Sequence, residues 1–183
     1  TASDGTAVAI DNDGYGDSQL SLAGTGSYAV AAWTRQTESF ASQEEGDTSA
    51  VTPEDQMVML NSTDVYAAVY DGSTWATTAL TDNGTPDLAP VAAANGANKA
   101  EDFKAIVAWR AVATSGVTTF DEKDTILYKV YDASQANTNN GTWEYGWSKE
   151  TYTLYNGTSG SVKAIEAAML SDGTAAVTYT LDT

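Results

Sequence analysis

The 183-residue sequence contains no cysteine and no histidine. It therefore has no thiol nucleophile, no thiolate zinc ligand, no imidazole general base and no Ser-His-Asp triad. The lack of cysteine does not decide the compartment, because many bacterial surface modules have no disulfides. Any catalysis would have to use carboxylates, tyrosine, lysine or arginine.

Basic residues are scarce: 8 Lys and Arg stand against 25 Asp and Glu, which gives a formal net charge of −17. Such a chain would be repelled by phosphate backbones and anionic membranes, so nucleic acid is excluded as an expected partner. No apolar run is long enough to span a membrane, and we expect no membrane insertion. Because the chain opens with Thr1 and not Met, we expect a mature or excised piece of a longer chain.

A pattern recurs three times: a short apolar strand, a glycine-bearing turn, and an alternating strand that ends in an aromatic residue. The copies are residues 17–35, 87–111 and 161–180, with Trp33, Trp109 and Tyr179 at equivalent positions. A second pair of strands follows the first two copies, at 65–84 and 127–157, where Tyr70-Asp71 matches Tyr131-Asp132. We expect the three equivalent aromatic residues to lie in the core.

The repeat predicts an all-β domain of four-stranded antiparallel units, at about residues 17–84, 87–157 and 161–183, preceded by a strand at 6–10. The first two units are complete and the others are partial. No window has a convincing helical pattern except residues 163–170, where the repeat favours a strand instead. A long acidic loop is expected at 37–56, with a shorter equivalent at about 114–124.

Short motifs within these units carry a resemblance to a known architecture. They are Asp-Leu-Ala-Pro at 87–90, Ile-Val-Ala-Trp at 106–109 and Asp-Gly-Ser-Thr-Trp at 71–75. The units resemble the blades of bacterial extracellular β-propellers, and the last motif is similar to a degenerate sialidase-type Asp-box. The resemblance implies a propeller-type fold in a secreted or bacterial cell-surface protein, and it implies architecture rather than hydrolysis.

Closure of such a fold is a physical problem for this chain, because propellers need about four or more blades. Unclosed sheet edges invite pairing. The chain is therefore expected to be part of a longer chain or to form a homo-oligomer completed by a neighbouring copy. A β-sandwich built from the same strands is the alternative fold.

A candidate calcium site lies in Asp-Asn-Asp-Gly-Tyr-Gly-Asp at residues 11–17, with Asp11, Asp13 and Asp17 as ligands. Carboxylates at spaced positions around a glycine turn can converge on a hard cation such as Ca²⁺. The loop resembles the tail of the calcium loop in integrin-type propeller repeats, without one upstream ligand. The alternative is an acidic turn between units, in which Asp and Gly serve backbone geometry.

A candidate glycan site combines Trp143, Tyr145 and Trp147 with Asn140 and Lys149. Flat aromatic faces with flanking polar groups hold sugar rings, and strand alternation would place the three aromatic side chains on one face. On this hypothesis Trp147→Ala abolishes retention on polysaccharide with little change in melting temperature. The alternative is that this face is buried against a neighbouring sheet.

The sequence thus favours a non-catalytic extracellular module for scaffolding, adhesion or recognition of a glycan or protein partner. One alternative is a self-assembling structural module completed by a neighbouring chain. Another is a fragment of a carboxylate glycoside hydrolase, which would need two acids flanking one bond. No spacing pairs candidates such as Asp87 and Glu166. Arg35 and Arg110 are expected to stack or to form salt bridges between units.

Overall fold

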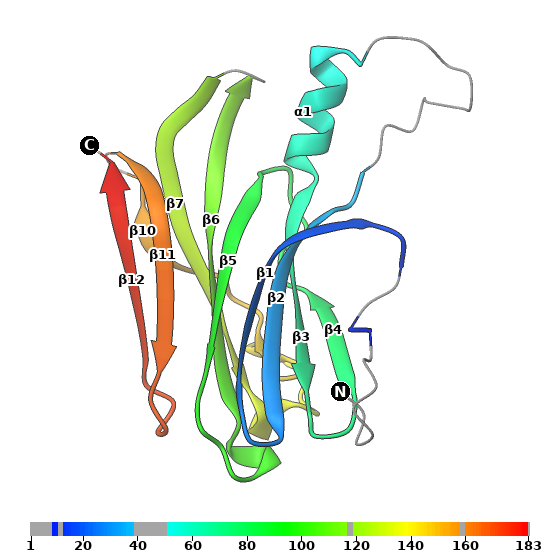
Figure 1. The fold of residues 1–183 in the computed structure, drawn as a ribbon, viewed down its shortest axis with the longest axis vertical. Coiled ribbons are helices and arrows are strands. Elements are labelled where there is room, and N and C mark those ends of the chain that lie inside the picture. The colour runs from blue at the N-terminus through cyan, green and yellow to red at the C-terminus, as the bar shows by residue number, and fades with distance from the viewer. Residues whose placement is uncertain (1–8, 11–12, 39–50, 117–118, 158–159, 183) are drawn as a thin grey trace.

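The computed structural model describes residues 9–10, 13–38, 51–116, 119–157 and 160–182 (Figure 1). These residues form antiparallel β-sheets with one α-helix, so the all-β expectation is confirmed. Most of the strand expected at 6–10 lies outside the described residues. No helix in the described ranges is both long enough and apolar enough to cross a membrane.

Three sheets follow one another along the chain. The first contains β1 (Gly16–Thr25), β2 (Tyr28–Gln36), β3 (Thr63–Tyr70) and β4 (Trp75–Ala79) in that order. The second contains β5 (Asp87–Ala94), β6 (Lys104–Gly116), β7 (Thr119–Asp132) and β10 (Tyr152–Asn156), with a hairpin of β8 (Trp143–Glu144) and β9 (Trp147–Ser148) also on β7. The third is the hairpin of β11 (Ser161–Met169) and β12 (Ala175–Asp182).

The second sheet packs between the other two, because its strands are apolar on both faces. Trp109 and Val107 on β6 contact the first sheet, whereas Ala108 on the same strand contacts the third. This alternation follows from the two-residue period of a strand. Burying each large side chain here contributes about 1.5–3 kcal/mol. The residues that join the first two sheets are Val30, Ala32, Val65, Ala67, Val69, Leu80, Phe103, Val107, Trp109 and Trp147.

The first strands of the first two sheets share an irregularity. The β1–β2 register shifts between Ser18 and Ser21, and the β5–β6 register shifts between Leu88 and Val91. Each bulge contains a residue with positive φ, 55° at Gln19 and 51° at Ala89. Oε1 of Gln19 accepts a 2.7 Å hydrogen bond from the backbone N–H of Ala89, so the two bulges lie in contact.

Two local expectations are wrong, and one is confirmed. Residues 39–50 of the expected acidic loop lie outside the described residues, but residues 53–56 belong to helix α1 (Pro53–Asn61), whose N-terminus is fixed by a reciprocal capping box between Thr52 and Asp55. The shorter loop expected at 114–124 is mostly strand, because β6 runs to Gly116 and β7 begins at Thr119. Residues 163–170 are a strand except for Leu170, as the repeat predicted.

Candidate functional site

Connections between strands of all three sheets gather at one end of the molecule, the lower end in Figure 1, which we call the loop end. The β5–β6 connection there contains a short 3-10 turn, η1 (Ala100–Asp102), and a second one, η2 (Ala133–Gln135), follows β7. Two hollows flank the β5–β6 connection, and both are lined in part by Glu101. One is aromatic and the other is polar.

The aromatic groove has a volume of about 280 Å³. Phe103 is 1% exposed and lies at its base, with the ring centroid of Tyr28 5.8 Å away and that of Tyr131 6.1 Å away. The ring of Trp147 packs edge-on against Tyr131 at 5.2 Å, so it supports the groove from within the core. The lining residues are Tyr28, Val69, Tyr70, Asp71, Ala100, Glu101, Phe103, Tyr131, Ala133, Ala136 and Asn137.

One rim of this groove is the β3–β4 turn, which contains the Asp-Gly-Ser-Thr-Trp motif. Oδ1 of Asp71 accepts 2.8 Å hydrogen bonds from the backbone N–H groups of Ser73 and Thr74. These bonds lower the pKa of Asp71, so the rim carries a carboxylate at neutral pH. Trp75 packs on Tyr70 at 5.3 Å. The side chain of Asp71 therefore serves the geometry of this turn.

Tyr131 forms one wall of the groove and remains a neutral phenol. Burial raises its pKa, and the nearby carboxylates of Asp71 and Asp132 raise it further. A neutral phenol can both donate and accept hydrogen bonds. The groove therefore offers aromatic faces, a phenol hydroxyl, two carboxylates and the Asn137 amide to a ligand.

The polar cleft, of about 640 Å³, lies on the other side of the β5–β6 connection. Its Asn95 side chain braces the connection: Nδ2 donates to the carbonyl of Asp102 at 2.8 Å, and Oδ1 accepts from the N–H of Lys104 at 2.9 Å. Nζ of Lys104 lies 3.6 Å from Asp132. The remaining lining residues are Gly96, Ala97, Asn98, Lys99, Glu101, Ser134, Ser171 and Asp172.

The sequence-predicted glycan residues do not share one face. Tyr145 and Gly146 form the turn between β8 and β9, Trp143 pairs with Ser148, and Trp147 pairs with Glu144. The expectation of a single aromatic face is therefore wrong, because the chain reverses where a continuous strand was expected. Tyr145 is 62% exposed and Trp147 is 3% exposed.

The two polar members of that predicted set lie beside the same hairpin. Oδ1 of Asn140 accepts hydrogen bonds from the backbone N–H groups of Thr142 and Trp143, at 2.7 and 2.9 Å, so this side chain fixes a turn. The Lys149 side chain is exposed. Of the five residues, Asn140, Tyr145 and Lys149 are exposed, Trp143 is half-buried, and Trp147 belongs to the core.

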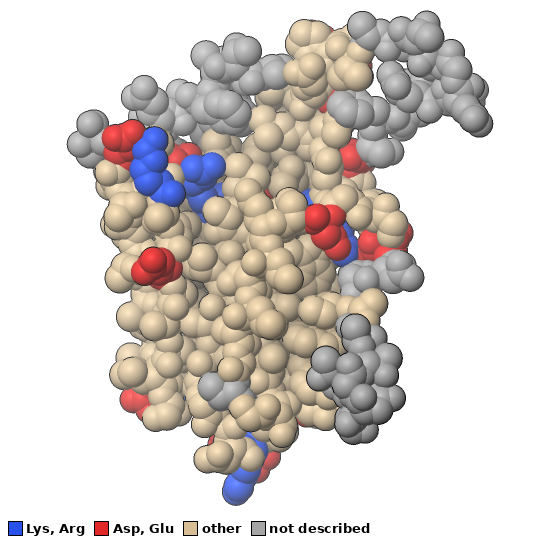
Figure 2. Space-filling model, in the orientation of Figure 1, with Lys and Arg blue, Asp and Glu red and all other residues tan. Residues whose placement is uncertain are grey.

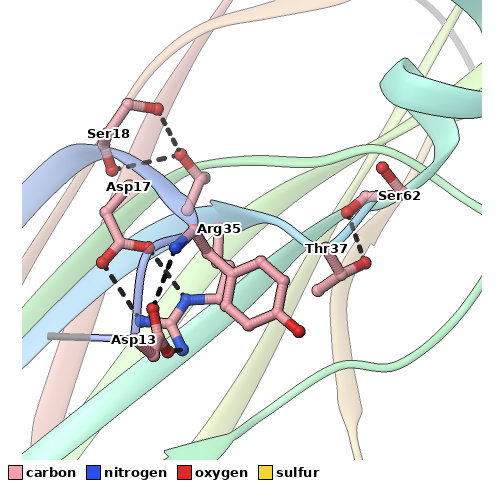
Figure 3. A network of polar contacts seen from close by, with 8 residues as sticks. Asp13, Asp17, Ser18, Arg35, Thr37 and Ser62 are labelled. Carbon is pink, nitrogen blue, oxygen red and sulfur yellow. Dashed lines mark hydrogen bonds and ion pairs between the residues drawn. The ribbon is translucent and has the colours of Figure 1, made fainter. Parts of the chain in front are cut away.

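The candidate calcium ligands meet an arginine (Figure 3). Asp13 forms an ion pair with Nη1 of Arg35, and Asp17 accepts from Nε at 2.9 Å and from Nη2 at 3.1 Å. Arg35 is 3% exposed and its guanidinium lies 4.3 Å from the ring centroid of Tyr66. Asp11 lies outside the described residues. With a guanidinium on both described carboxylates, this arrangement fits Ca²⁺ poorly unless Arg35 moves.

The buried carboxylates elsewhere hold the sheets together. Asn83, in the connection between the first two sheets, donates to Asp64 through its backbone N–H at 3.2 Å and to Asp87 through Nδ2 at 2.9 Å. Asp124 accepts from the N–H of Val162 in the third sheet at 2.7 Å. Arg110 donates to the carbonyl of Val162 at 2.9 Å, a hydrogen bond between sheets, whereas its ion pair, with Asp124 at 3.8 Å, lies within the second sheet and is not the salt bridge between units that was expected.

The three equivalent aromatic residues differ in burial. Trp109 is completely buried and Trp33 is 4% exposed, but Tyr179 is 38% exposed, so the core prediction is wrong for Tyr179. Tyr179 lies on the two-stranded third sheet, where its ring contacts only Tyr155 at 5.4 Å among the ring pairs of the described residues. A sheet of two strands leaves this position half covered.

Comparisons of this chain with protein-family models, with curated proteins and with solved structures give no match. Tyr28, Phe103 and Tyr131 line the groove but were not predicted as site residues from the sequence. The signal was present in the matched pairs Tyr70-Asp71 and Tyr131-Asp132, because an aromatic residue at a strand end beside a turn faces the rim of a sheet stack.

Proposed function

We propose that this chain is a non-catalytic recognition module of the extracellular surface that binds a glycan in the aromatic groove at its loop end. The observation that carries the proposal is the juxtaposition of Tyr28 and Tyr131 over Phe103, with Asp71 and Glu101 at the rim. Sugar rings present apolar C–H faces to aromatic side chains and hydroxyls to polar groups. The secreted or cell-surface location expected from the sequence is part of this proposal.

The buried acids outside the groove are engaged in the architecture, which removes them as candidates for glycoside hydrolysis. Asp64, Asp87 and Asp124 are each buried and hydrogen-bonded to groups that join sheets. Glycoside hydrolysis needs two carboxyl groups facing one bond across an open site. These three acids serve the architecture instead, because their oxygens accept from the backbone, from Asn83 and from Trp109.

We further propose that the three sheets are propeller-type blades and not the layers of a sandwich. The matching bulges at Gln19 and Ala89 support this arrangement, as does the contact between β1 and β5, the first strands of successive sheets. Ile10 packs against the cluster that contains Trp33, and Leu80 belongs to the cluster that contains Trp109, so the segment before each sheet contributes an apolar residue to the corresponding cluster. Repeated contacts of this kind are expected when one unit stacks on the next.

The groove is tested by affinity electrophoresis of the purified chain through gels containing neutral or acidic polysaccharides. Tyr28→Ala is expected to lower retention tenfold or more, because it removes one aromatic wall. Tyr15→Ala is the matched control, since Tyr15 is 54% exposed and lies away from the groove. Retention that depends on Tyr145 and not on Tyr28 would transfer the site to the β8–β9 hairpin and refute the groove.

A further inference from the structure

Within each stacked pair of sheets, one face is supplied by the earlier sheet and one by the later. Trp109 on the second sheet faces the first, and Val177 and Leu181 on the third sheet face the second. Trp33 holds the position equivalent to Trp109 and packs on the face of the first sheet that points away from the second. By this repetition, the Trp33 face is built to receive a preceding sheet.

The part of the Trp33 face over β1 is open. Leu20 is 66% exposed and Leu22 is 63% exposed, whereas Pro90 and Ala92, the equivalent residues on β5, are buried and half-buried. An apolar hollow of about 360 Å³ lies beside Leu20, lined also by Ile10 and Trp33. The buried Nε1 of Trp33 has no hydrogen-bond partner among the described residues.

The complementary open surface lies at the other end of the stack, on the far face of the third sheet. Its side chains are small or polar and all are exposed, namely Ala164, Glu166, Ala168, Ala176, Thr178 and Thr180. At the positions equivalent to Ala176 and Thr178, Val30 and Ala32 of the first sheet are completely buried against the second. This face therefore lacks the neighbour that its counterpart has.

We infer that the occupant of both open surfaces is a second copy of this chain, with the far face of the third sheet of each copy packed on the Trp33 face of the other. This inference rests on the blade arrangement proposed above. Two identical contacts related by a two-fold axis would close three sheets and three sheets into one ring, which leaves no open face. Figure 2 shows few charged residues over β1, β5 and β11, the strands that would line its centre.

The repeat also specifies one polar contact between the copies. Within the chain, Oγ of Ser21 on β1 accepts a 3.0 Å hydrogen bond from the N–H of Ala92 on β5. Glu166 holds the place of Ser21 on β11, since Ser21 pairs with Ala32 and Glu166 with Thr178. Leu22 holds the place of Ala92. The Glu166 carboxylate of one copy would therefore accept from the Leu22 N–H of the other, which gives this isolated charge a partner.

The test is sedimentation equilibrium of the full chain with a charge-swap series. The unmodified chain is expected to be a dimer. Leu22→Glu places a carboxylate opposite Glu166 of the other copy and should raise the dissociation constant about tenfold or more. Adding Glu166→Lys to Leu22→Glu should restore the dimer. The control is Leu154→Glu, which adds the same charge at a 41% exposed leucine on β10.

The melting temperatures and the oligomeric state together decide whether the two copies form the proposed contact. Melting temperatures that stay within a few degrees of the unmodified chain show that the stack inside each copy is intact, so a lost dimer reports on the contact between copies alone. A monomer at all concentrations overturns the inference, as does a species larger than a dimer, which would mean that the contact does not close. Equal effects of Leu22→Glu and Leu154→Glu overturn the assigned face. Glycan retention is measured separately and does not depend on this result.

Discussion

The indole Nε1 of Trp109 donates a 2.9 Å hydrogen bond to Oδ1 of Asp87, and both side chains are completely buried. The other carboxylate oxygen accepts from Nδ2 of Asn83 at 2.9 Å. Burial outweighs these hydrogen bonds and raises the pKa of Asp87 to about 6. The join between the first two sheets is therefore sensitive to pH, because it contains a carboxyl group that titrates near neutrality.

Asp87 should make folding stability fall as the pH rises. Its folded pKa of about 6 exceeds the ordinary value of 3.8, so the folded state holds the proton more tightly than the unfolded state. The contribution is complete below about pH 4 and is lost by about pH 6, a difference of roughly 3 kcal/mol. Asp87→Asn should flatten this dependence in urea unfolding between pH 4 and 7, since an amide keeps an acceptor for Trp109 and does not titrate.

Asp172→Asn is the control for that measurement. Asp172 is exposed, and hydrogen bonds from Thr174 hold its pKa below the usual range, so it does not titrate near pH 6. Its replacement should leave the slope of stability against pH unchanged. If Asp87→Asn kept the slope of the unmodified chain, the pH dependence would belong to other carboxyl groups, of which Asp64 is the first candidate because burial also raises its pKa.

The Trp147→Ala substitution separates a core role from a ligand role. Trp147 is 3% exposed and packs against Tyr131, so its truncation should cost about 3–5 kcal/mol of unfolding free energy. Tyr145→Ala, at a 62% exposed side chain in the same hairpin, should cost little. The measurement is urea denaturation followed by circular dichroism. Nearly equal stabilities for the two variants would show that Trp147 is not part of the core.

The β8–β9 hairpin depends on one glycine. Gly146 has φ of +92°, and a Cβ atom there would overlap Cε2 of Tyr131. Gly146→Ala should therefore destabilise the fold by about 2 kcal/mol or more and displace Tyr131 from the groove wall. Gly141→Ala is the matched control, because no atom lies within 4 Å of its Cβ position. Thermal unfolding of the two variants side by side tests this, and equal midpoints would contradict it.

The strands of the three sheets could be predicted from the sequence, whereas the residues of the groove could not. Period-two alternation and the repeated Trp position are local signals, and they were sufficient for antiparallel sheets and for the strand at β11. The groove arises where Tyr28, Phe103 and Tyr131 from three separate strand ends meet, and no local pattern encodes that meeting. The Tyr145-Gly146 turn was misread because three aromatic residues at alternate positions suit a continuous strand equally well. Its positive φ values of 47° and 92° are visible only in the structure.

The surroundings of the Arg35 side chain likewise depend on contacts between strands, which the sequence alone does not show. Its guanidinium reaches Asp13 and Asp17 because β2 pairs with β1 and brings Arg35 opposite Asp17. The spacing of the acids in residues 11–17 could not show that a cation of the protein itself would neutralise them. The calcium site stays a prediction, and Arg35 is the residue that decides it.

Arg35→Gln tests the calcium prediction directly. In EDTA the substitution should lower the unfolding free energy by about 2 kcal/mol, less than for a fully buried ion pair, because the Asp13 and Asp17 side chains are 33% and 36% exposed. The substitution also frees both carboxylates as oxygen ligands, so millimolar Ca²⁺ should restore part of the lost melting temperature, while Mg²⁺ should restore less because it accepts only near-ideal octahedral geometry. The unmodified chain should respond weakly to Ca²⁺, since the ion has to displace a guanidinium held by two carboxylates. A variant that Ca²⁺ leaves unchanged would show that residues 11–17 form an acidic turn and not a metal loop.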